Sequence, residues 1–266
     1  MKGHRMNAKT NGFYFACAKR NGRRVAVFLL ASAVAFFCVF GLLGDLAANA
    51  AEDISVADRV SAAEAAVEVS QAIGQSAVSL SVPALLQNPE LPTGCESVAL
   101  TDLLLFYGFD LEKTTIADYW LPTSSTDFVY AFLGDPHDAS SHACLAPCIA
   151  QTANQYLSAQ GSQLAAYELT GASFSEVLAN VEEGYPVIIW ATVDLKDPGD
   201  EPYLTQWAND RLYGLFANNH CMVVSGYDAG ASTVTVSDPL EGTVDYDMGL
   251  LAQRFAELGS QAVLIA

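Results

Sequence analysis

The sequence predicts an α+β domain, with helices dominating its first half and an antiparallel sheet its second half. The first half holds a mostly apolar helix that begins at Cys95 and a second helix from Ala146 to Ala159. The second half holds an unbroken apolar run from Pro186 to Val193, typical of a buried strand, and closely spaced strands from His220 onward. Helices followed by neighbouring strands are the pattern of an α+β layout.

Local signals place the other elements. Ser173 and Glu176 have the spacing of a capping box, so a helix begins there and Gly184 ends it. A short helix is expected at 112–120, and polar loops are expected at 121–143 and 196–218. The remaining predicted elements are strands at 163–169, 220–227, 233–237, 242–246 and 261–265 and a helix at 249–258.

Residues 1–50 have the features of an export signal. Seven basic residues lie within residues 1–24, and the run from Val25 to Gly44 carries no charge and is long enough to span a bilayer. The basic cluster predicts a cytoplasmic N-terminus, and Ala48-Asn49-Ala50 has the small residues of a signal-peptidase site. We therefore expect a signal peptide or membrane anchor at 1–50, a spacer at 51–81 and a domain at 82–266, secreted or held at the extracellular face of the cell membrane.

The exported part is strongly acidic. Residues 51–266 keep five basic and 29 acidic residues, a net charge of −24. Such a surface repels nucleic acid, so no nucleic-acid partner is expected, and solubility is the simplest reason for the charge. Contact with the membrane is expected only through the N-terminal segment, if that segment is not cleaved.

Cys95 is the first candidate for chemistry. The prolines and glycine between Leu86 and Gly94 forbid a helix, and the helical pattern starts at once from Cys95. The free N–H groups and dipole at a helix N-terminus favour a thiolate, which is the attacking species in covalent catalysis. A buried, inert cysteine is the alternative. Gln87 lies eight positions upstream, close enough to turn back onto the same sulfur.

His220 and Asp238 complete a possible catalytic set. His220 opens an apolar strand, a position that suits a rigidly held general base. Asp238 ends the next strand, eighteen residues later, so an antiparallel pair would bring its carboxylate near the imidazole and orient it. A hydrogen-bonded core histidine and a turn-forming Asp-Pro sequence are the alternatives.

A competing site is formed by His137, His142, Cys144 and Cys148, which lie within twelve residues and could ligate zinc. The spacings are irregular, and Cys148 falls inside a predicted helix. A local disulfide or two packed thiols fits Cys144 and Cys148 better. We therefore expect neither a metal nor a cofactor.

Three stretches together resemble a known family. They are Gln87 to Glu96, the strand from His220 that ends Ser225-Gly226-Tyr227-Asp228, and Ser237-Asp238-Pro239. Over residues 82–266 the chain resembles the bacterial papain-like cysteine peptidases related to the bacteriocin-processing peptidase domain, which cleaves double-glycine leaders. The resemblance implies a helical layer carrying the nucleophile, packed on an antiparallel sheet that carries the histidine and aspartate.

The same resemblance assigns roles to four residues: Cys95 as nucleophile, His220 as base, Asp238 as orienting acid and Gln87 as oxyanion-hole donor. It implies a cysteine peptidase acting through a thioester acyl-enzyme on a peptide or protein substrate. Processing members are usually fused to a transporter that this sequence lacks, so an extracellular or envelope peptide is the expected substrate. An amidase or acyltransferase of the same fold and a non-catalytic envelope binding domain are the alternatives, and the intact set of four residues argues against the last.

Overall fold

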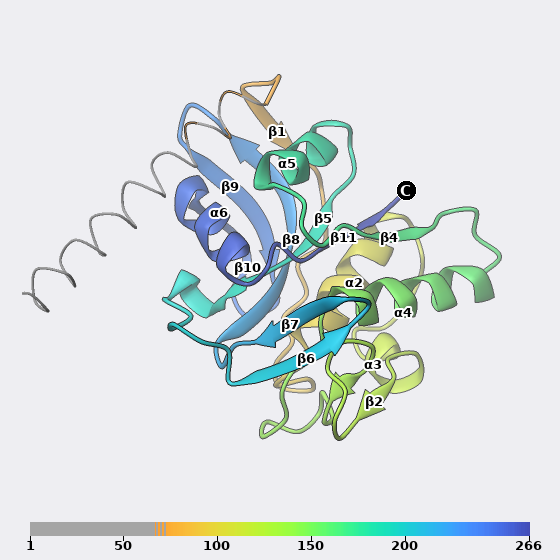
Figure 1. Cartoon of the computed structure of the whole chain (residues 1–266). Helices are drawn as coiled ribbons and strands as arrows, with labels where there is room; N and C mark the ends of the chain where they lie inside the picture. Colours follow the sequence, from red (N-terminus) through yellow and green to blue (C-terminus); the bar gives the residue numbers. More distant parts are fainter. Residues whose placement is uncertain (1–66, 68, 70, 72) are drawn as a thin grey trace, which may run out of the picture. The chain divides into compact units, whose positions relative to one another are not determined.

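The structure is a computed structural model of the chain and describes residues 67, 69, 71 and 73–266 (Figure 1). The expected leader at 1–50 and most of the expected spacer at 51–81 lie outside the described residues. Within the part of the chain that is described, no helix is both long enough and apolar enough to cross a membrane.

An antiparallel sheet organises the described residues. Its strands lie in the order β10-β9-β8-β5-β11-β4, and β1 pairs with the far end of β8, so this sheet has seven strands within the described residues. The strands are β1 (Ala77–Ser79), β4 (Ala166–Glu168), β5 (Val187–Thr192), β8 (Asn219–Asp228), β9 (Thr233–Asp238), β10 (Gly242–Asp247) and β11 (Ala262–Ile265).

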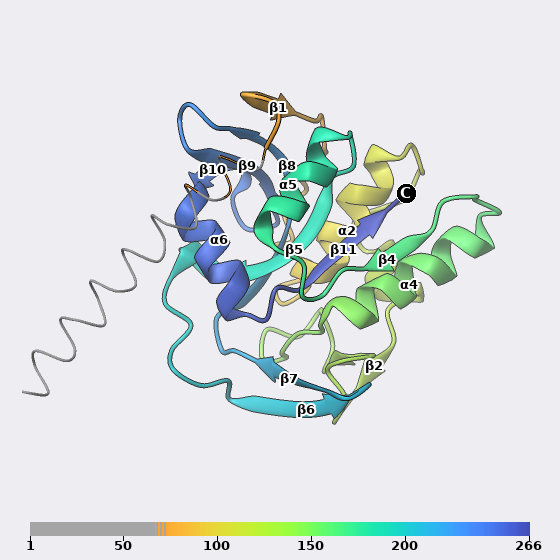
Figure 2. The ribbon, with the colours of Figure 1, turned by 45° about the horizontal axis from the view of Figure 1, so that its top comes forward.

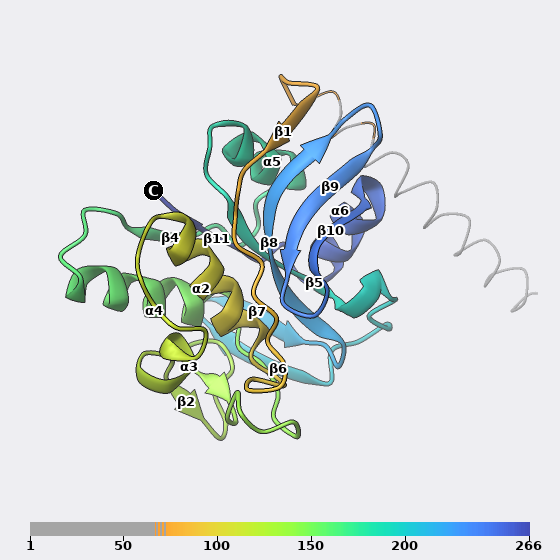
Figure 3. The same ribbon diagram turned by 180° about the vertical axis from the view of Figure 1, so that it is seen from behind.

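Helices cover both faces of this sheet. The helices α2 (Cys95–Phe106) and α4 (Ala146–Ala159) pack on one face, and α5 (Phe174–Glu182) and α6 (Met248–Glu257) pack on the other (Figures 1 and 3). In β8, Cys221 and Val223 belong to the core under α2 and α4, whereas Met222 and Val224 belong to the core under α5 and α6. A strand buried on both faces reads as an apolar run, as residues 187–191 of β5 and residues 221–224 of β8 do.

The helix α2 begins at Cys95, as the sequence predicts. The backbone N–H of Val98 donates to Gly94 O at 3.0 Å, which closes the first turn. A Cβ at Gly94 would lie 2.8 Å from the Cβ of Leu91, so only glycine fits where the segment before the helix folds against it. All residues from Cys95 to Leu104 are buried, which fixes the helix between the sheet and α4.

Asp102 ties α2 to two other segments of the site. Its carboxylate accepts hydrogen bonds from the backbone N–H of Leu85 at 3.1 Å and from the hydroxyl of Ser237 at 2.7 Å. Leu85 lies two residues before Gln87, and Ser237 lies directly before Asp238. The Asp102 carboxylate therefore holds both the segment that carries Gln87 and the strand that carries Asp238. Burial raises the pKa of Asp102 to about 7.

This pKa predicts how Asp102→Asn changes stability with pH. A carboxyl whose pKa is higher in the folded state binds more protons there, so its contribution to stability falls as pH rises from about 4 to about 7, by up to about 4 kcal/mol. Asparagine can keep both contacts without titrating. We expect urea unfolding to show the variant gaining stability relative to the wild type between about pH 4 and about pH 8. An unchanged stability difference across this range would contradict the assignment.

The sequence interpretation of 196–218 as a loop was wrong in its centre. Strands β6 (Leu204–Ala208) and β7 (Arg211–Leu215) form a hairpin there. Its two-residue turn, Asn209-Asp210, has positive φ at both positions, 47° and 59°, which matches the right-handed twist of a hairpin. The two strands lack the alternation of a half-buried strand, because the apolar residues Leu204, Trp207 and Leu212 are exposed.

Smaller differences concern segments too short for a periodic signal. The end of the expected spacer forms β1 and pairs with β8, so the sheet begins before Val82. The loop at 121–143 contains β2 (Thr123–Ser124) and β3 (Phe132–Leu133), which pair in parallel. The short helix α3 covers Thr115–Tyr119, and a 3₁₀ turn, η1 (Val193–Leu195), follows β5. Figure 2 shows the hairpin of β6 and β7 lying apart from the main sheet.

Candidate active site

A cavity of about 390 Å³ lies at the N-terminus of α2. Gln87, Cys95 and His220, three of the four residues singled out from the sequence, line it together. They come from the segment before α2, from the first residue of α2 and from the beginning of β8. The remaining wall is made by Pro92, Thr93, Ser141, His142, Ala143, Val193, Tyr203, Phe216, Ala217, Asn219 and Leu240.

Asp238, the fourth residue, lies behind His220. The Nε2–H of His220 donates to Asp238 Oδ1 at 2.7 Å, and both side chains are buried. The pairing of β8 with β9 shifts register between Val224 and Gly226 and brings the end of β9 beside the start of β8. This bond fixes the imidazole ring through Nε2 and leaves its other ring nitrogen, Nδ1, free to accept a proton, as expected for a base oriented by an acid.

Two further donors hold the Asp238 carboxylate. The backbone N–H of Leu240 donates to Oδ1 at 2.8 Å, and the hydroxyl of Tyr246 donates to Oδ2 at 2.9 Å. Burial alone would raise the pKa of Asp238, but His220 and these two donors hold it below its ordinary value. Tyr246 was missed by sequence reasoning, because nothing local in β10 indicates that its hydroxyl returns to the end of β9.

Gln87 is 3 % exposed and is held from two sides. Its backbone N–H donates to Pro239 O at 2.8 Å, and its side-chain Nε2 donates to Pro92 O at 2.9 Å. A primary amide carries two N–H groups, so one stays available for a group in the cavity.

Glu96, the residue after Cys95, is a functional candidate that the sequence reasoning passed over. Its side chain is fully buried; Oε2 lies 3.3 Å from Cys95 Sγ, and Oε1 accepts the backbone N–H of Cys144 at 3.0 Å. The available signal was a charged residue in the first turn of a mostly apolar helix.

The surroundings of Cys95 differ from the simple expectation of a thiolate. Burial, followed by the charge of Glu96, raises the pKa of the Cys95 thiol well above its ordinary value. The backbone N–H of Cys221 acts in the opposite direction. The helix N-terminus also favours the thiolate. The protonation state of Glu96 therefore bears directly on the nucleophile.

The four residues of the competing zinc site are not gathered around one point: the two histidines have other partners, and the two cysteines contact each other. His137 contacts Asp118 Oδ1 at 2.8 Å, and His142 Nδ1 contacts the Tyr203 hydroxyl at 2.8 Å. Cys144 and Cys148 are buried free thiols that contact each other. Among the described residues, no three or more histidine, cysteine or carboxylate side chains are grouped as metal ligands.

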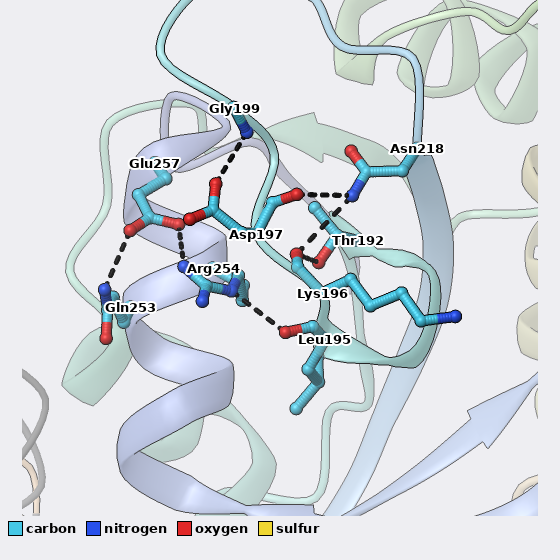
Figure 4. A network of polar contacts seen from close by, with 9 residues as sticks. All are labelled: Thr192, Leu195, Lys196, Asp197, Gly199, Asn218, Gln253, Arg254 and Glu257. Carbon is cyan, nitrogen blue, oxygen red and sulfur yellow. Dashed lines mark hydrogen bonds and ion pairs between the residues drawn. The ribbon is translucent and has the colours of Figure 1, made fainter. Parts of the chain in front are cut away.

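The loop after β5 forms a fixed wall of the cavity through Val193. The side chain of Asn218 donates to Asp197 O at 3.0 Å, and Arg254 Nε donates from α6 to Leu195 O at 3.0 Å (Figure 4). The loop is thus held from the β8 side and from α6, which keeps Val193 in place beside the site.

Comparison with known proteins agrees with this geometry. Residues 79–263, more than half of the chain, match the model of the Peptidase_C39 like family. The chain belongs to the Peptidase_C39 like family. The resemblance inferred from the sequence is confirmed, and the α+β, papain-like fold is confirmed as well: helices carrying Cys95 pack on an antiparallel sheet carrying His220 and Asp238.

Individual relatives of this C39-like chain are moderately similar. A Bacillus subtilis protein named as the uncharacterised protein YvpB is 27% identical over 186 residues, covering 66% of this chain and 70% of its own. A solved Bacillus anthracis structure described as a C39-like peptidase is 26% identical, with a TM-score of 0.63, and the match covers 72% of this chain and 98% of that chain. A double-glycine-motif protease from an AMS/PCAT transporter, solved with its leader peptide, is 16% identical, with a TM-score of 0.40 and coverage of 71% and 91%. Family and fold are those of cysteine peptidases.

Proposed function

We propose that the chain is an exported cysteine peptidase that hydrolyses peptide bonds through Cys95, His220 and Asp238. The observation that carries the proposal is the buried hydrogen bond from His220 to Asp238, because His220 lines the same cavity as Cys95. A nucleophile, a base and a group that orients the base are the parts that covalent acyl transfer requires.

The reaction follows from the positions of these groups. His220 takes the proton of the Cys95 thiol as the sulfur attacks the substrate carbonyl carbon, and then gives that proton to the leaving amine. The acyl group remains on Cys95 as a thioester. Water, deprotonated by His220, attacks the thioester and releases the acid. Asp238 keeps the imidazole in one tautomer and stabilises its charged form without taking the proton.

Attack at the carbonyl places negative charge on its oxygen, and two donors are available to bind it. The backbone N–H of Cys95 lies at the open N-terminus of α2, and Gln87 has the N–H that Pro92 does not use. Because Gln87 is buried and held through its backbone as well, its amide needs little reorganisation during the reaction.

Gln87→Ala is therefore expected to slow peptide turnover by about a hundredfold or more, the usual cost of losing one oxyanion donor. Alkylation of Cys95 by iodoacetamide creates no oxyanion, so its rate serves as the control and should change little. Single-turnover kinetics with peptide and with iodoacetamide give the two rates. If peptide turnover of the variant stays within about twofold of the parent, the oxyanion role is wrong.

Export is proposed from the basic cluster, the uncharged run and the small-residue site within residues 1–50. We expect protease added to intact cells to cut the domain if the N-terminal segment is an anchor, or the domain to be found in the medium if that segment is cleaved. A domain that stays protected until the cells are lysed would contradict export. An external location would make extracellular or envelope peptides the substrates.

A peptide library ending in an aldehyde tests the peptidase proposal without a known substrate. Library members that fit the cavity should form a hemithioacetal with Cys95. Cys95 should then be alkylated more slowly by iodoacetamide, and mass spectrometry measures the extent of alkylation at each thiol. His220→Ala should lose this protection. Protection of all four described thiols alike, or of none, would argue for a non-catalytic binding domain.

An amidase or acyltransferase remains the second candidate, because the same thioester can react with an amine instead of water. Adding amines such as glycinamide during turnover distinguishes hydrolysis from acyl transfer. A peptidase or an amidase gives mainly free acid, whereas an acyltransferase gives mainly the new amide.

A further inference from the structure

We propose that Glu96 controls the proton of the Cys95 sulfur, so that the nucleophile is active when the Glu96 carboxyl is neutral and is held as a thiol when it is ionised. This inference rests on the proposed role of Cys95 as nucleophile. It gives a role to a buried carboxyl that the triad mechanism does not use.

The contacts of Glu96 place it on the reacting atom. Its Oε2 lies 3.3 Å from Cys95 Sγ, and no part of its side chain reaches solvent. Its other oxygen is occupied by the backbone N–H of Cys144 at 3.0 Å. None of the ion pairs found in the described residues includes Glu96, so no basic side chain there neutralises it.

The contact between Sγ and Oε2 holds one hydrogen. If Glu96 is ionised, that hydrogen belongs to the thiol, which donates it to the carboxylate. If Glu96 is neutral, its O–H donates to a thiolate, a charge-assisted bond that stabilises the nucleophile. Cys144 N–H can donate to Oε1 in both states, so the two forms differ only in where protons lie.

The number of protons shared by Cys95, His220 and Glu96 decides whether Cys95 is a thiolate. With two protons on the three groups, a thiolate, an imidazolium and a neutral carboxyl form a set with one opposite-charge pair. With one proton, a thiolate and an imidazolium would leave the Glu96 carboxylate beside the thiolate, and like charges at this distance are disfavoured. The thiol, neutral imidazole and carboxylate then replace them.

Other groups near this pair do not take over the titration. Tyr203, Cys144 and Cys221 face Glu96, and burial raises the pKa of each, which keeps them neutral around pH 7. Asp238 faces Cys95 through His220, and its pKa is lowered, so it stays ionised. Burial raises the pKa of Glu96 itself to about 7.

The predicted behaviour is opposite to that of an ordinary cysteine. An ordinary thiol reacts faster as pH rises, since the thiolate fraction increases. Here the alkylation rate of Cys95 should fall about tenfold per pH unit once Glu96 ionises, before rising again at strongly alkaline pH.

The test compares the wild type with Glu96→Gln. The rate of iodoacetamide modification at Cys95 is measured by peptide mapping between about pH 5 and about pH 9. Glutamine keeps an acceptor for Cys144 N–H and offers an N–H to the sulfur, but it does not titrate. We expect the fall in rate to move at least about one pH unit upward, so that near pH 8 the variant reacts about tenfold or more faster than the wild type.

Asp102→Asn is the matched control. Asp102 is a second buried carboxyl on α2 with a raised pKa, but its partners are Leu85 and Ser237. This variant should follow the wild-type profile. If Glu96 only holds the Cys144 backbone in place, Glu96→Gln preserves that contact and its profile would match the wild type, which overturns the inference.

Two further outcomes keep the inference separate from the proposed function. If Glu96→Gln does not fold, the wild-type profile alone decides: a rate that rises steadily with pH overturns the inference, and a fall near pH 7 supports it. If Cys95 reacts no faster than Cys144, Cys148 and Cys221 at any pH, the proposed function fails and the inference falls with it. Selective Cys95 modification with a profile unaffected by Glu96→Gln overturns the inference alone.

Discussion

Cys95→Ala is expected to abolish peptide hydrolysis, with a rate loss on the order of a millionfold, while the folded structure is retained. Removing the nucleophile of a triad removes the covalent route, and the other members cannot act without it. Alanine favours a helix, and the position is at the helix start, so the fold loses little. Turnover of a library-derived peptide and the thermal unfolding midpoint, measured on the same sample, check both halves of the expectation.

Cys148→Ala is the matched control for this variant. Cys148 is also a buried free thiol, but it lies within α4 and outside the walls of the cavity. The Cys148→Ala variant should keep its peptide turnover even if its thermal unfolding midpoint falls. If both variants lose activity in parallel with their stability, Cys95 would have a structural role only.

Asp238→Ala is expected to have the second largest effect, a fall in kcat on the order of ten-thousandfold with little change in KM. Alanine leaves His220 Nε2, Leu240 N–H and the Tyr246 hydroxyl without their common acceptor. The imidazole then loses both its orientation and the charge that stabilises its protonated form. Steady-state kinetics with one cleavable peptide separate kcat from KM.

Asp238→Asn distinguishes orientation from charge. Its Oδ1 can still accept from His220 and Leu240, and its amide can face the Tyr246 hydroxyl, which also accepts. We expect activity between that of the parent and that of Asp238→Ala. Equal, unimpaired turnover in both variants would leave Cys95 and His220 as a dyad and give Asp238 a turn-forming role.

Local signals were enough to predict the elements that carry the site. The prolines before Gly94 and the apolar run after it fix the start of α2, and the Ser173–Glu176 capping box forms as predicted, with both of its hydrogen bonds present. The double-sided burial of β5 and β8 was also readable, because their runs lack polar alternation.

Features that depend on distant segments were not predictable in the same way. The hydrogen bond from Tyr246 to Asp238 forms only because β10 pairs antiparallel with β9. The three residues of β1 form a strand only by pairing with β8, which lies far away in the sequence. Glu96 reads in the sequence as a favourable acid in a first helical turn. Its contacts with Cys95 and with Cys144, 48 positions away, depend on the packing of the following loop against α2.

The candidate site itself was predicted as separate weak signals. His220 and Asp238 each had a structural alternative, and only their joint occurrence with the segment from Gln87 to Cys95 pointed to a family. The structure places Gln87, Cys95 and His220 around one cavity and joins His220 to Asp238. The protonation of Cys95 could not be inferred from the helix N-terminus alone, because burial and Glu96 oppose that effect.

The most direct test of the central claim is digestion of a mixed peptide library in water labelled with heavy oxygen, followed by mass spectrometry of the products. If hydrolysis proceeds through Cys95, the wild-type protein should produce new C-termini that each carry one heavy oxygen atom. Cys95→Ala should produce no new C-termini. New termini formed equally by both proteins, or no new termini with the wild type, would contradict a peptidase that acts through Cys95.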